Sequence, residues 1–323
     1  AQKLIANNAV DIAVEETPDF IHLDLTLSAG ENYCRVVVKG THTNVVELYI
    51  NGQPQPLSEK QNTSTQRETL PTFSLQQAYD FINRVDFNDI RFILDAARLN
   101  SALAAEGKTK KYGLNINGTF SDAVKNGLMS NDLLSKVIIN TVAASDARMG
   151  GAPVVAMSNF GSGNQGITAT MPVVVVAEHL GVDEETLARA LSLSHLTAIS
   201  IHSRYTRLSA LCAASTAAMG AAAGMAWLFT RDINTINTAI INMVSDITGM
   251  ICDGASNSCA MKVSSVVSSA FKAVLMAMQN SCAGANDGIV CADVEQTINN
   301  LCRLVIKPMT LTDKEIISIM VAK

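Results

Sequence analysis

Residues 208–229 read LSALCAASTAAMGAAAGMAWLF and carry no charge. Their length fits a membrane span, and Gly220 and Gly224 have the G-x-x-x-G spacing of closely packed transmembrane helices. Most of the stretch, however, is Ala, Gly, Ser or Thr, which gain little from lipid. Arginines also flank both ends, so there is no positive-inside bias. We therefore expect a buried central helix in tight contact with its neighbours.

Helical periodicity extends on both sides of this stretch, from residue 73 to the end of the chain. Besides the central helix, helices are expected at residues 88–104, 121–143, 183–196, 232–249, 259–279 and 293–304. Capping boxes at Ser74-x-x-Gln77 and Thr312-x-x-Glu315 predict two further helix starts. Small residues at contact positions let helix backbones approach closely, which favours a compact bundle.

The N-terminal residues instead alternate apolar and polar side chains with period two. Strands are expected at residues 10–14, 21–27, 33–39 and 45–50, forming a small antiparallel sheet. Residues 56–72 have the polar composition of a linker. The prediction is an α+β protein, with a small domain at residues 1–55 and a larger all-α domain at residues 73–323. Because the chain starts at Ala1, we expect the small domain to lack an upstream segment.

Composition excludes several classes of protein. Hydrophobic residues make up 48% and charged residues 16% of the 323-residue chain, which fits a compact globular protein. A net charge of -5 and a pI near 5.6 argue against a nucleic-acid partner. Seven cysteines, an odd number, and the lack of a secretory signal favour a reducing, cytoplasmic setting without a membrane anchor. A homodimer is plausible from the many apolar helices.

Three cysteines are candidate metal ligands. Cys252 and Cys259 bracket an acidic, Gly-containing hexapeptide, and Cys212 lies early in the apolar stretch. Thiolates hold iron-sulfur clusters or zinc, and the expected helix start at Cys259 would favour its thiolate. A C-x6-C pair is a weak signature, so spacing leaves a metal site and buried structural cysteines equally open. Cys34, Cys282, Cys291 and Cys302 are expected to be structural.

A second candidate site is the polar, glycine-rich segment at residues 157–166, MSNFGSGNQG, set between apolar stretches. It could be an ordinary interhelical loop, but its density of donors favours a carboxylate-binding loop. The candidate substrate-binding residues there are Ser158, Asn159, Ser162, Asn164 and Gln165.

Charged and histidine side chains supply further candidates. Lys262 follows Cys259 by one helical turn and could meet a carboxylate, although a surface lysine is the common alternative. Asp253 and Arg148 are candidate substrate-binding residues. His42, between two expected strands, is a candidate catalytic residue with Lys262. His195 and His202 could share a helix face at their spacing of seven.

These segments together resemble a known family. Arg148-Met-Gly-Gly, residues 157–166, Leu208-Ser-Ala-Leu-Cys212, residues 249–255 (GMICDGA) and Cys259-Ala-Met-Lys262 resemble the helical domain of the iron-sulfur-dependent L-serine dehydratase superfamily. They are most similar to its L-cysteine desulfidase branch.

The resemblance implies that Cys212, Cys252 and Cys259 hold a [4Fe-4S] cluster with one iron open to substrate. That iron would act as a Lewis acid while a base removes the alpha proton and the beta substituent leaves. The products would be pyruvate, ammonia and hydrogen sulfide from L-cysteine, or pyruvate and ammonia from L-serine. The substrate partner is thus a small amino acid.

The chain departs from the family at one point. Members of this branch carry a Gly-Cys-Thr-Glu-Pro motif, whose cysteine is thought to be the base, and this sequence has none. We expect the base in an upstream segment. Two alternatives stay open: a pyridoxal-phosphate lyase with Lys262 as its Schiff-base lysine, and a cluster-binding or redox-sensing module without turnover.

Overall fold

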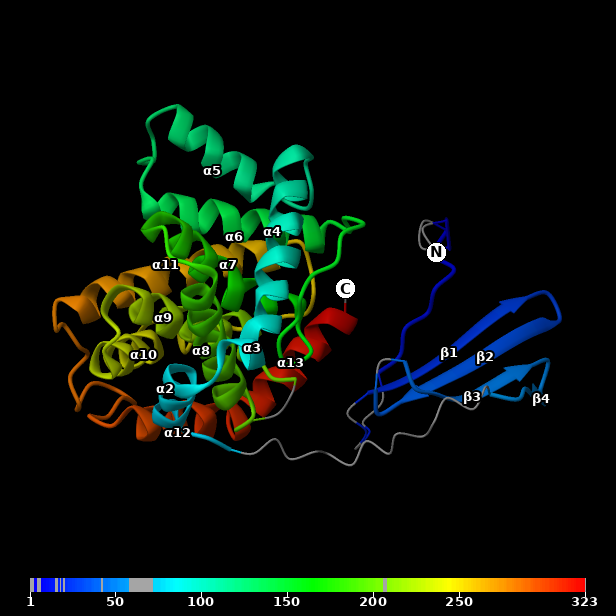
Figure 1. Ribbon diagram of the computed structural model, residues 1–323. Helices are drawn as coiled ribbons and strands as arrows, with labels where there is room; N and C mark the ends of the chain where they lie inside the picture. Colours follow the sequence, from blue (N-terminus) through cyan, green and yellow to red (C-terminus); the bar gives the residue numbers. More distant parts are fainter. Residues whose placement is uncertain are drawn as a thin grey trace. The chain divides into compact units, whose positions relative to one another are not determined.

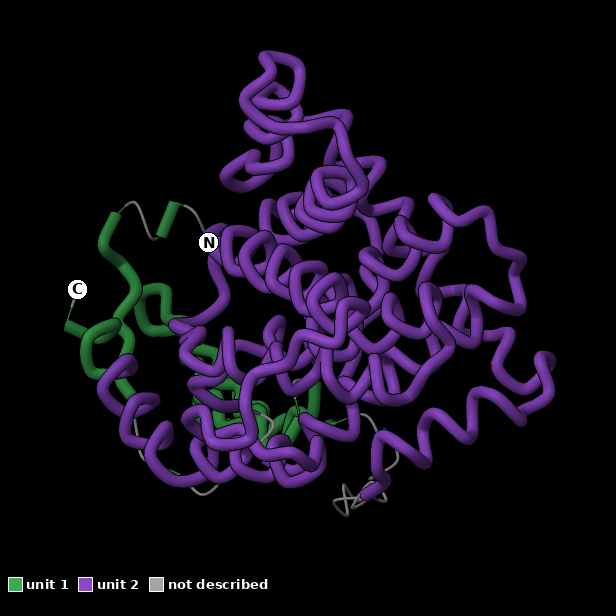
Figure 2. Tube along the Cα trace, turned by 90° about the vertical axis from the view of Figure 1, so that its left-hand side faces the viewer, with its two compact units in different colours: residues 1–71, 318–323 green, residues 72–317 purple. Residues whose placement is uncertain are grey.

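The computed structural model describes residues 3, 4, 7–14, 17, 19, 21–41, 43–57, 72–205 and 208–322. The chain divides into two compact units: residues 1–71 with 318–323, and residues 72–317 (Figure 2). The first contains an antiparallel sheet and the second is helical, so the predicted α+β class is confirmed. Residues 58–71, which make up most of the predicted linker, lie outside the described part.

The sheet has four strands in the order of the sequence (Figure 1). They are β1 (His22–Ala29), β2 (Asn32–Lys39), β3 (Val45–Ile50) and β4 (Gln53–Pro54), each antiparallel to the next. Two-residue turns join β1 to β2 and β3 to β4, and Gly30 and Gly52 adopt positive φ angles of 61° and 79° there. Glycine occupies these positions because it pays no steric penalty in that region.

The strand expected at residues 10–14 does not form. This segment is described without strand structure, and Val10, Ile12 and Val14 are exposed. Alternation indicates which face of a strand would be buried, but a strand also needs a partner for its backbone groups. The register of the described sheet begins only at His22.

Helices fill the second unit. They are α2 (Leu75–Arg84), α3 (Phe87–Ile90), the 3-10 turn η1 (Arg91–Ile93), α4 (Leu94–Thr109), α5 (Ile116–Lys125), α6 (Leu133–Met149), α7 (Gly163–Leu180), α8 (Glu184–His202), α9 (Ala213–Thr230), α10 (Ile233–Ile247), α11 (Cys259–Met278) and α12 (Val294–Ile306). The last helix, α13 (Met309–Val321), continues past residue 317.

Helix α9 is the centre of the core. It packs against α7, α8, α10 and α11, and nearly all of its residues are buried (Figure 1). A Cβ on Gly220 would overlap the Ser194 carbonyl of α8, so the small residue is what allows the two helices to approach. The buried central helix predicted from residues 208–229 is therefore confirmed, although it begins at Ala213.

Four predicted helix starts are confirmed by their caps. Ser74 forms the predicted capping box with Gln77, and Asp183, Asp232 and Asp293 accept amide hydrogen bonds at the starts of α8, α10 and α12. The single helix expected at residues 121–143 is wrong: it is divided into α5 and α6 by a turn in which Gly127 has φ 73°. Thr312 starts no helix, because α13 is already under way there.

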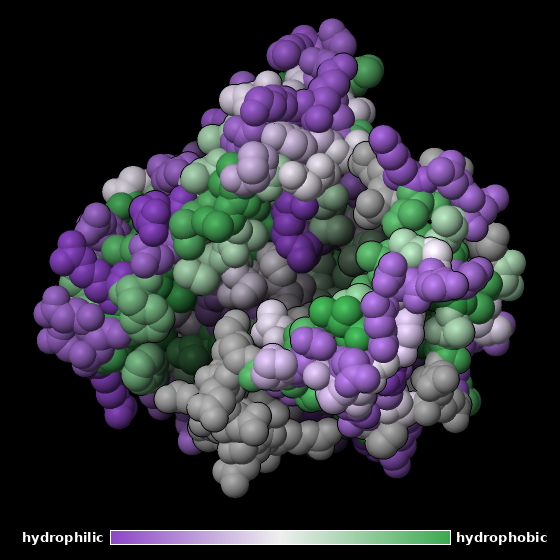
Figure 3. Space-filling view, turned by 90° about the vertical axis from the view of Figure 1, so that its right-hand side faces the viewer, coloured by the Kyte–Doolittle hydropathy of each residue, from purple (hydrophilic) through white to green (hydrophobic). Residues whose placement is uncertain are grey.

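Several large apolar side chains remain exposed, and Figure 3 shows such hydrophobic residues in green on one face of the molecule. One described helix, α11, is long and apolar enough to cross a membrane by length and composition. Half of the apolar part of this helix is buried inside the protein.

Candidate functional site

Two cysteine segments lie side by side although they are far apart in the sequence. Leu211 and Ile251 form an isolated antiparallel bridge. The Cys212 amide donates to the Met250 carbonyl at 2.9 Å, and the Cys252 amide donates to the Ala210 carbonyl at 2.7 Å. This short ladder explains why the chain before α9 is extended rather than helical, and it holds Cys212 and Cys252 on neighbouring backbones.

The third cysteine lies at the end of the loop that follows Cys252. Cys259 is the first residue of α11, as the sequence predicted. The Ser256 amide donates to its Sγ at 3.5 Å, and the thiol donates to the Gly254 carbonyl at 3.6 Å. Gly254 has φ 100°, which favours glycine at this turn. The loop therefore folds back around the Cys259 sulfur.

The other two thiols and Lys262 act electrostatically on Cys212. The pKa of Cys212 is raised to about 11, mainly by burial and also by the neighbouring Cys252 and Cys259. The Ala214 amide at the start of α9 and the Lys262 ammonium act in the opposite direction. Cys212 is accordingly a neutral thiol at pH 7 in this state, and a bound cation would be needed to hold it as a thiolate.

Lys262 lies on α11 beside these cysteines and forms an ion pair with Asp253. Its side chain is 19% exposed. Burial lowers the pKa of Lys262, but the hydrogen bond and charge of Asp253, together with Cys212 and Cys252, outweigh burial and raise it. Lys262 is therefore a cation at neutral pH, and Asp253 holds it in place.

Arg148 is a second cation near the cysteines, since it lies close to Cys259. It lies near the C-terminal end of α6 and packs against α7, where a Cβ on Gly163 would overlap its guanidinium. Burial lowers the pKa of Arg148, and the opposing effect of the nearby Cys259 is smaller. The contact with Gly163 connects the cysteine region to the glycine-rich segment.

The glycine-rich segment is partly a turn and partly a helix start. Asn159 and Ser162 pair through two backbone hydrogen bonds of 3.1 and 2.9 Å, with Phe160 and Gly161 at positive φ between them. Ser162 caps α7 by accepting from the Gln165 amide. The prediction of a loop through residue 166 is wrong, because residues 163–166 form the first turn of α7.

Buried side chains behind this turn form a continuous hydrogen-bonded network. The His202 Nδ1 donates to Gln165 Oε1 at 2.8 Å, and Gln165 Nε2 donates to Asn159 Oδ1 at 2.9 Å. Asn159 Nδ2 donates to His195 Nδ1 at 3.0 Å. His195 Nε2 in turn lies 3.0 Å from Thr170 Oγ1, whose own proton goes to the Gly166 carbonyl.

The partners fix the protonation state of the network. His195 accepts at Nδ1 and donates at Nε2, which is a neutral imidazole. Burial lowers its pKa to about 4, in agreement with that state. His202 stacks between Phe160 and Tyr205, with ring centroids 4.4 and 4.6 Å apart, and the Tyr205 hydroxyl lies 2.6 Å from Thr216 Oγ1. The network therefore extends from α7 and α8 to the first turn of α9.

The predicted site residues thus separate into groups. Cys212, Cys252, Cys259, Lys262 and Asp253 lie together, with Arg148 beside Cys259. Asn159 and Gln165 are buried within the network, Asn164 is buried and bonded to Ser145, and Ser158 is exposed. His42 lies outside the described residues.

The sequence analysis assigned no role to Tyr205. For His195 and His202 it predicted only that the two side chains could share one face of a helix. Their seven-residue spacing was the available signal, since it places both on one face of α8.

The cysteines suit a soft metal in chemistry. All three are free thiols, and two are joined through the Leu211–Ile251 bridge. Within the described ranges, no three His, Cys, Asp or Glu side chains stand close enough together to hold one metal ion. The three cysteines are therefore the residue type that a thiolate-bound cluster requires, and they lie near one another. Their side chains, however, do not converge on one point.

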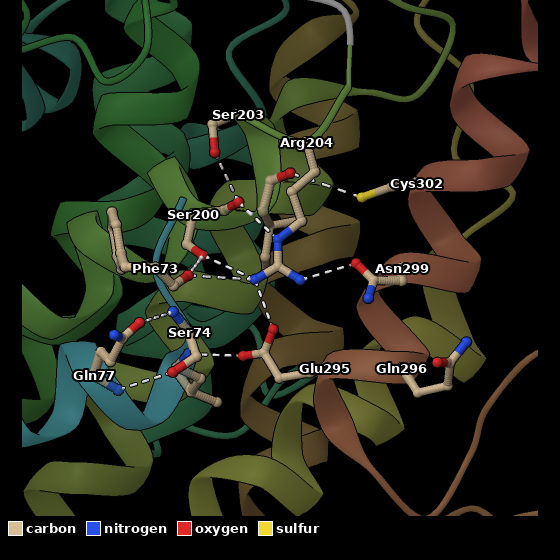
Figure 4. Close-up of polar contacts among 12 residues, drawn as sticks. Phe73, Ser74, Gln77, Ser200, Ser203, Arg204, Glu295, Gln296, Asn299 and Cys302 are labelled. Atoms are coloured by element: carbon tan, nitrogen blue, oxygen red, sulfur yellow. Dashed lines mark hydrogen bonds and ion pairs between the residues drawn. The ribbon is translucent and has the colours of Figure 1, made fainter. Parts of the chain in front are cut away.

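A separate cavity of about 510 Å³ opens where α2, α8 and α12 meet (Figure 4). Arg204 crosses it, contacting Glu295 Oε2 at 2.7 Å, Asn299 Oδ1 at 3.1 Å and the Ser200 carbonyl at 3.2 Å. The other Glu295 oxygen accepts from the Leu75 amide at the start of α2. Because these charged groups are already paired with one another, we assign this cavity a structural role.

Comparison with known proteins gives consistent matches. The family model described as serine dehydratase alpha chain matches residues 37–318. A UPF0597 protein of Klebsiella pneumoniae is 99% identical over this whole chain, which spans 76% of that protein. The UPF0597 protein YhaM of Escherichia coli K12 is 52% identical, and YhaM of Salmonella typhimurium is 50% identical; this chain spans 75% of each.

Proposed function

Because the chain belongs to the serine dehydratase alpha chain family, we propose that it is an iron-sulfur-dependent amino-acid lyase. The reaction is β-elimination from L-cysteine, giving pyruvate, ammonia and hydrogen sulfide, or from L-serine, giving pyruvate and ammonia. The observation that carries this proposal is the pairing of the Cys212 and Cys252 segments next to Cys259, with Lys262 and Arg148 beside them.

The three cysteines are the proposed ligands of a [4Fe-4S] cluster. When bound, such a cluster supplies a Lewis-acidic iron that can polarise a substrate oxygen or sulfur. The protein supplies charge compensation, because Lys262 and Arg148 are cations placed near sulfurs that become anionic as ligands. Asp253 keeps the Lys262 ammonium on that side.

The glycine-rich turn is the proposed binding element for the substrate carboxylate. Gly161 and Ser162 lie where the chain enters α7, and a helix start offers backbone amides to an anion. The network behind the turn holds it in one conformation, since Asn159 and Gln165 are tied to His195 and His202. This turn is thereby preorganised, which lowers the entropy lost on binding.

A pyridoxal-phosphate lyase is disfavoured by the state of Lys262. A Schiff-base lysine must be available as a neutral amine, and enzymes achieve this by lowering its pKa. The ion pair with Asp253 instead raises the pKa of Lys262. A non-catalytic, redox-sensing module would use the same cysteines, and turnover distinguishes it.

Iron content tests the ligand assignment. After anaerobic reconstitution with iron and sulfide, the protein is expected to show a broad, oxygen-sensitive visible absorption. Cys252→Ser should lose most of the iron, because serine is a poor ligand for this soft site. Cys291→Ser is the matched control and should retain it, since Cys291 Sγ instead accepts a hydrogen bond from Asn300 of α12. Equal iron in both variants would reject the assignment.

Turnover tests the reaction. This chain spans 76% of the Klebsiella relative, so the longer protein is the appropriate enzyme, compared under the same anaerobic conditions. Sulfide released from L-cysteine and pyruvate from either amino acid should be lost in Cys212→Ser and retained in Cys282→Ser. A cluster-loaded protein that releases neither product would favour the non-catalytic module.

A further inference from the structure

A buried asparagine of α4 contacts both ends of the glycine-rich segment. Asn100 is 0% exposed. Its Oδ1 accepts a hydrogen bond from the Met157 amide at 3.0 Å. Its Nδ2 donates to the Gly166 carbonyl at 3.3 Å and to Thr170 Oγ1 at 3.2 Å. Met157 and Gly166 are the first and last residues of the segment, so one side chain of another helix joins its two ends.

The two ends of the segment also touch each other directly. A Cβ on Gly166 would overlap the carbonyl oxygen of Met157, so a residue without a side chain is needed for this approach. Residues 157–166 therefore form a closed loop. Asn100 holds the base of that loop, and the turn at Phe160 and Gly161 lies in the middle of its sequence.

Asn100 also completes the buried network that contains His195. The Thr170 hydroxyl accepts from Asn100 Nδ2, lies 3.0 Å from His195 Nε2 and donates to the Gly166 carbonyl at 2.7 Å. A hydroxyl has one proton to donate and two lone pairs to accept with, so these three contacts use all of its capacity. A buried network that is fully satisfied in this way favours one arrangement of its members.

The Met157 amide depends on Asn100 more than the Gly166 carbonyl does. The carbonyl keeps its bond from Thr170 if Asn100 is removed, whereas the Met157 amide loses its bond to Asn100 Oδ1. A partly buried amide that loses its acceptor is costly, and it regains a partner only if the loop opens to water. Removal of Asn100 should therefore loosen the loop at its Met157 end.

We propose that Asn100 is a positioning residue of the lyase reaction, which holds the glycine-rich turn in the conformation that binds the substrate carboxylate. This inference rests on the proposed function, because that function assigns the carboxylate to Gly161 and Ser162. The carboxylate takes no part in bond making or breaking during β-elimination, so its contacts stabilise substrate and transition state alike. Loss of Asn100 should accordingly raise KM and leave kcat nearly unchanged.

Asn242 of α10 provides a matched control, because it holds a different loop in the same way. It is 5% exposed, its Nδ2 donates to the Ser281 carbonyl at 2.9 Å, and its Oδ1 accepts from the Ala283 amide at 2.9 Å. Residues 281–283 include none of the predicted site residues. Replacement of either asparagine by leucine removes two loop contacts from a buried position, and the loop that is released differs.

Steady-state kinetics of the cluster-loaded, longer Klebsiella protein test the role. Asn100→Leu should raise KM roughly tenfold for each amino acid that is turned over, as expected for the loss of about one hydrogen bond, with little change in kcat. Asn242→Leu should leave KM unchanged. A purely structural defect would differ, because a smaller folded fraction lowers the apparent kcat and leaves KM as it was. Asn100→Asp keeps an acceptor for the Met157 amide, and a smaller rise in KM is expected there even if Asn100→Leu does not fold.

Amide hydrogen exchange measures the loop without any turnover. In this chain, peptides that cover residues 157–162 should exchange roughly tenfold faster in Asn100→Leu than in the unsubstituted protein, because the loop opens more often. The same peptides in Asn242→Leu should exchange at the unsubstituted rate.

The possible failures are distinguishable. Unchanged exchange in Asn100→Leu would show that Asn100 does not hold the loop, and it would leave the proposed reaction standing. Faster exchange with an unchanged KM would show that the loop does not bind the carboxylate. Lack of turnover by the unsubstituted, cluster-loaded protein would overturn the proposed function itself, and with it the role of Asn100 in the reaction.

Discussion

Helix α9 and strand β1 are both rich in apolar residues, yet their surroundings differ. Met219 and Met225 of α9 are fully buried, whereas Leu25 of β1 is 67% exposed. Helix α9 has four helices around it, whereas among the described strands β1 has a neighbour on one edge only. Apolar character therefore shows that a segment requires a partner, and the rest of the fold determines whether that partner is present.

The difference should appear in how each region responds to substitution. In the helical unit, a substitution that adds or removes side-chain atoms should change stability strongly, because the packed interior has little free volume. On the leucine side of β1, the same changes affect side chains that are mostly exposed. The predictions below range from the largest expected effect to the smallest.

The largest effect is expected where α8 and α9 touch. Gly220→Ala would place a Cβ into the Ser194 carbonyl and should destabilise the helical unit by more than about 3 kcal/mol. Gly249→Ala is the matched control, since a Cβ there has no atom within 4 Å. The free energy of unfolding in urea checks both, and similar values for the two variants would show that the α8–α9 contact is not tight.

Removing a buried leucine should be the next largest effect. Leu193 on α8 is fully buried, and Leu193→Ala is expected to cost about 3 kcal/mol from lost contacts and the cavity left behind. Leu25→Ala should change stability by less than about 0.5 kcal/mol in this chain, because its side chain is mostly in solvent. A large loss from Leu25→Ala would mean that this side chain is packed against other residues rather than exposed.

His195 should make stability depend on pH. Its folded pKa is lowered to about 4 by burial, whereas an unfolded histidine titrates near pH 6.5. Between these values the unfolded chain binds a proton that the folded chain does not, so stability falls as pH drops, by about 3 kcal/mol in total. His195→Gln should flatten this dependence, and the exposed His179→Gln should not. An unchanged slope in His195→Gln would remove His195 as its source.

The smallest effect is expected at a helix start. Asp232 accepts hydrogen bonds from the Asn234 and Thr235 amides, and Asp232→Ala should cost about 1 kcal/mol. Asp232→Ser keeps an acceptor and should retain most of that stability. Thermal unfolding of the three proteins measures the difference, and identical midpoints would show that water replaces the cap without cost.

Helix starts and the central helix could be predicted because their signals are local. The capping box at Ser74 and the aspartates at 183, 232 and 293 need only neighbours a few residues away. The break between α5 and α6 was missed because the helical periodicity continues through Gly127, while the backbone there takes a positive φ.

The site was predictable in part. Residue type marked the three cysteines, Lys262 and the glycine-rich segment. The pairing of Leu211 with Ile251 was not predictable, since neither residue has a local reason to adopt bridge geometry. The amide and histidine network was also hidden, because hydrogen bonds between α7 and α8 depend on how the two helices pack.

The sequence by itself determined the α+β class, most helices and the kind of chemistry that its thiols can support. These follow from periodicity, caps and side-chain type, which act over a few residues. Only the tertiary structure decided that Cys212 and Cys252 are neighbours, that Asp253 holds Lys262, and that β1 has an exposed apolar side. Such facts depend on contacts between distant segments, and their energies are set by burial and by partners that a local pattern does not contain.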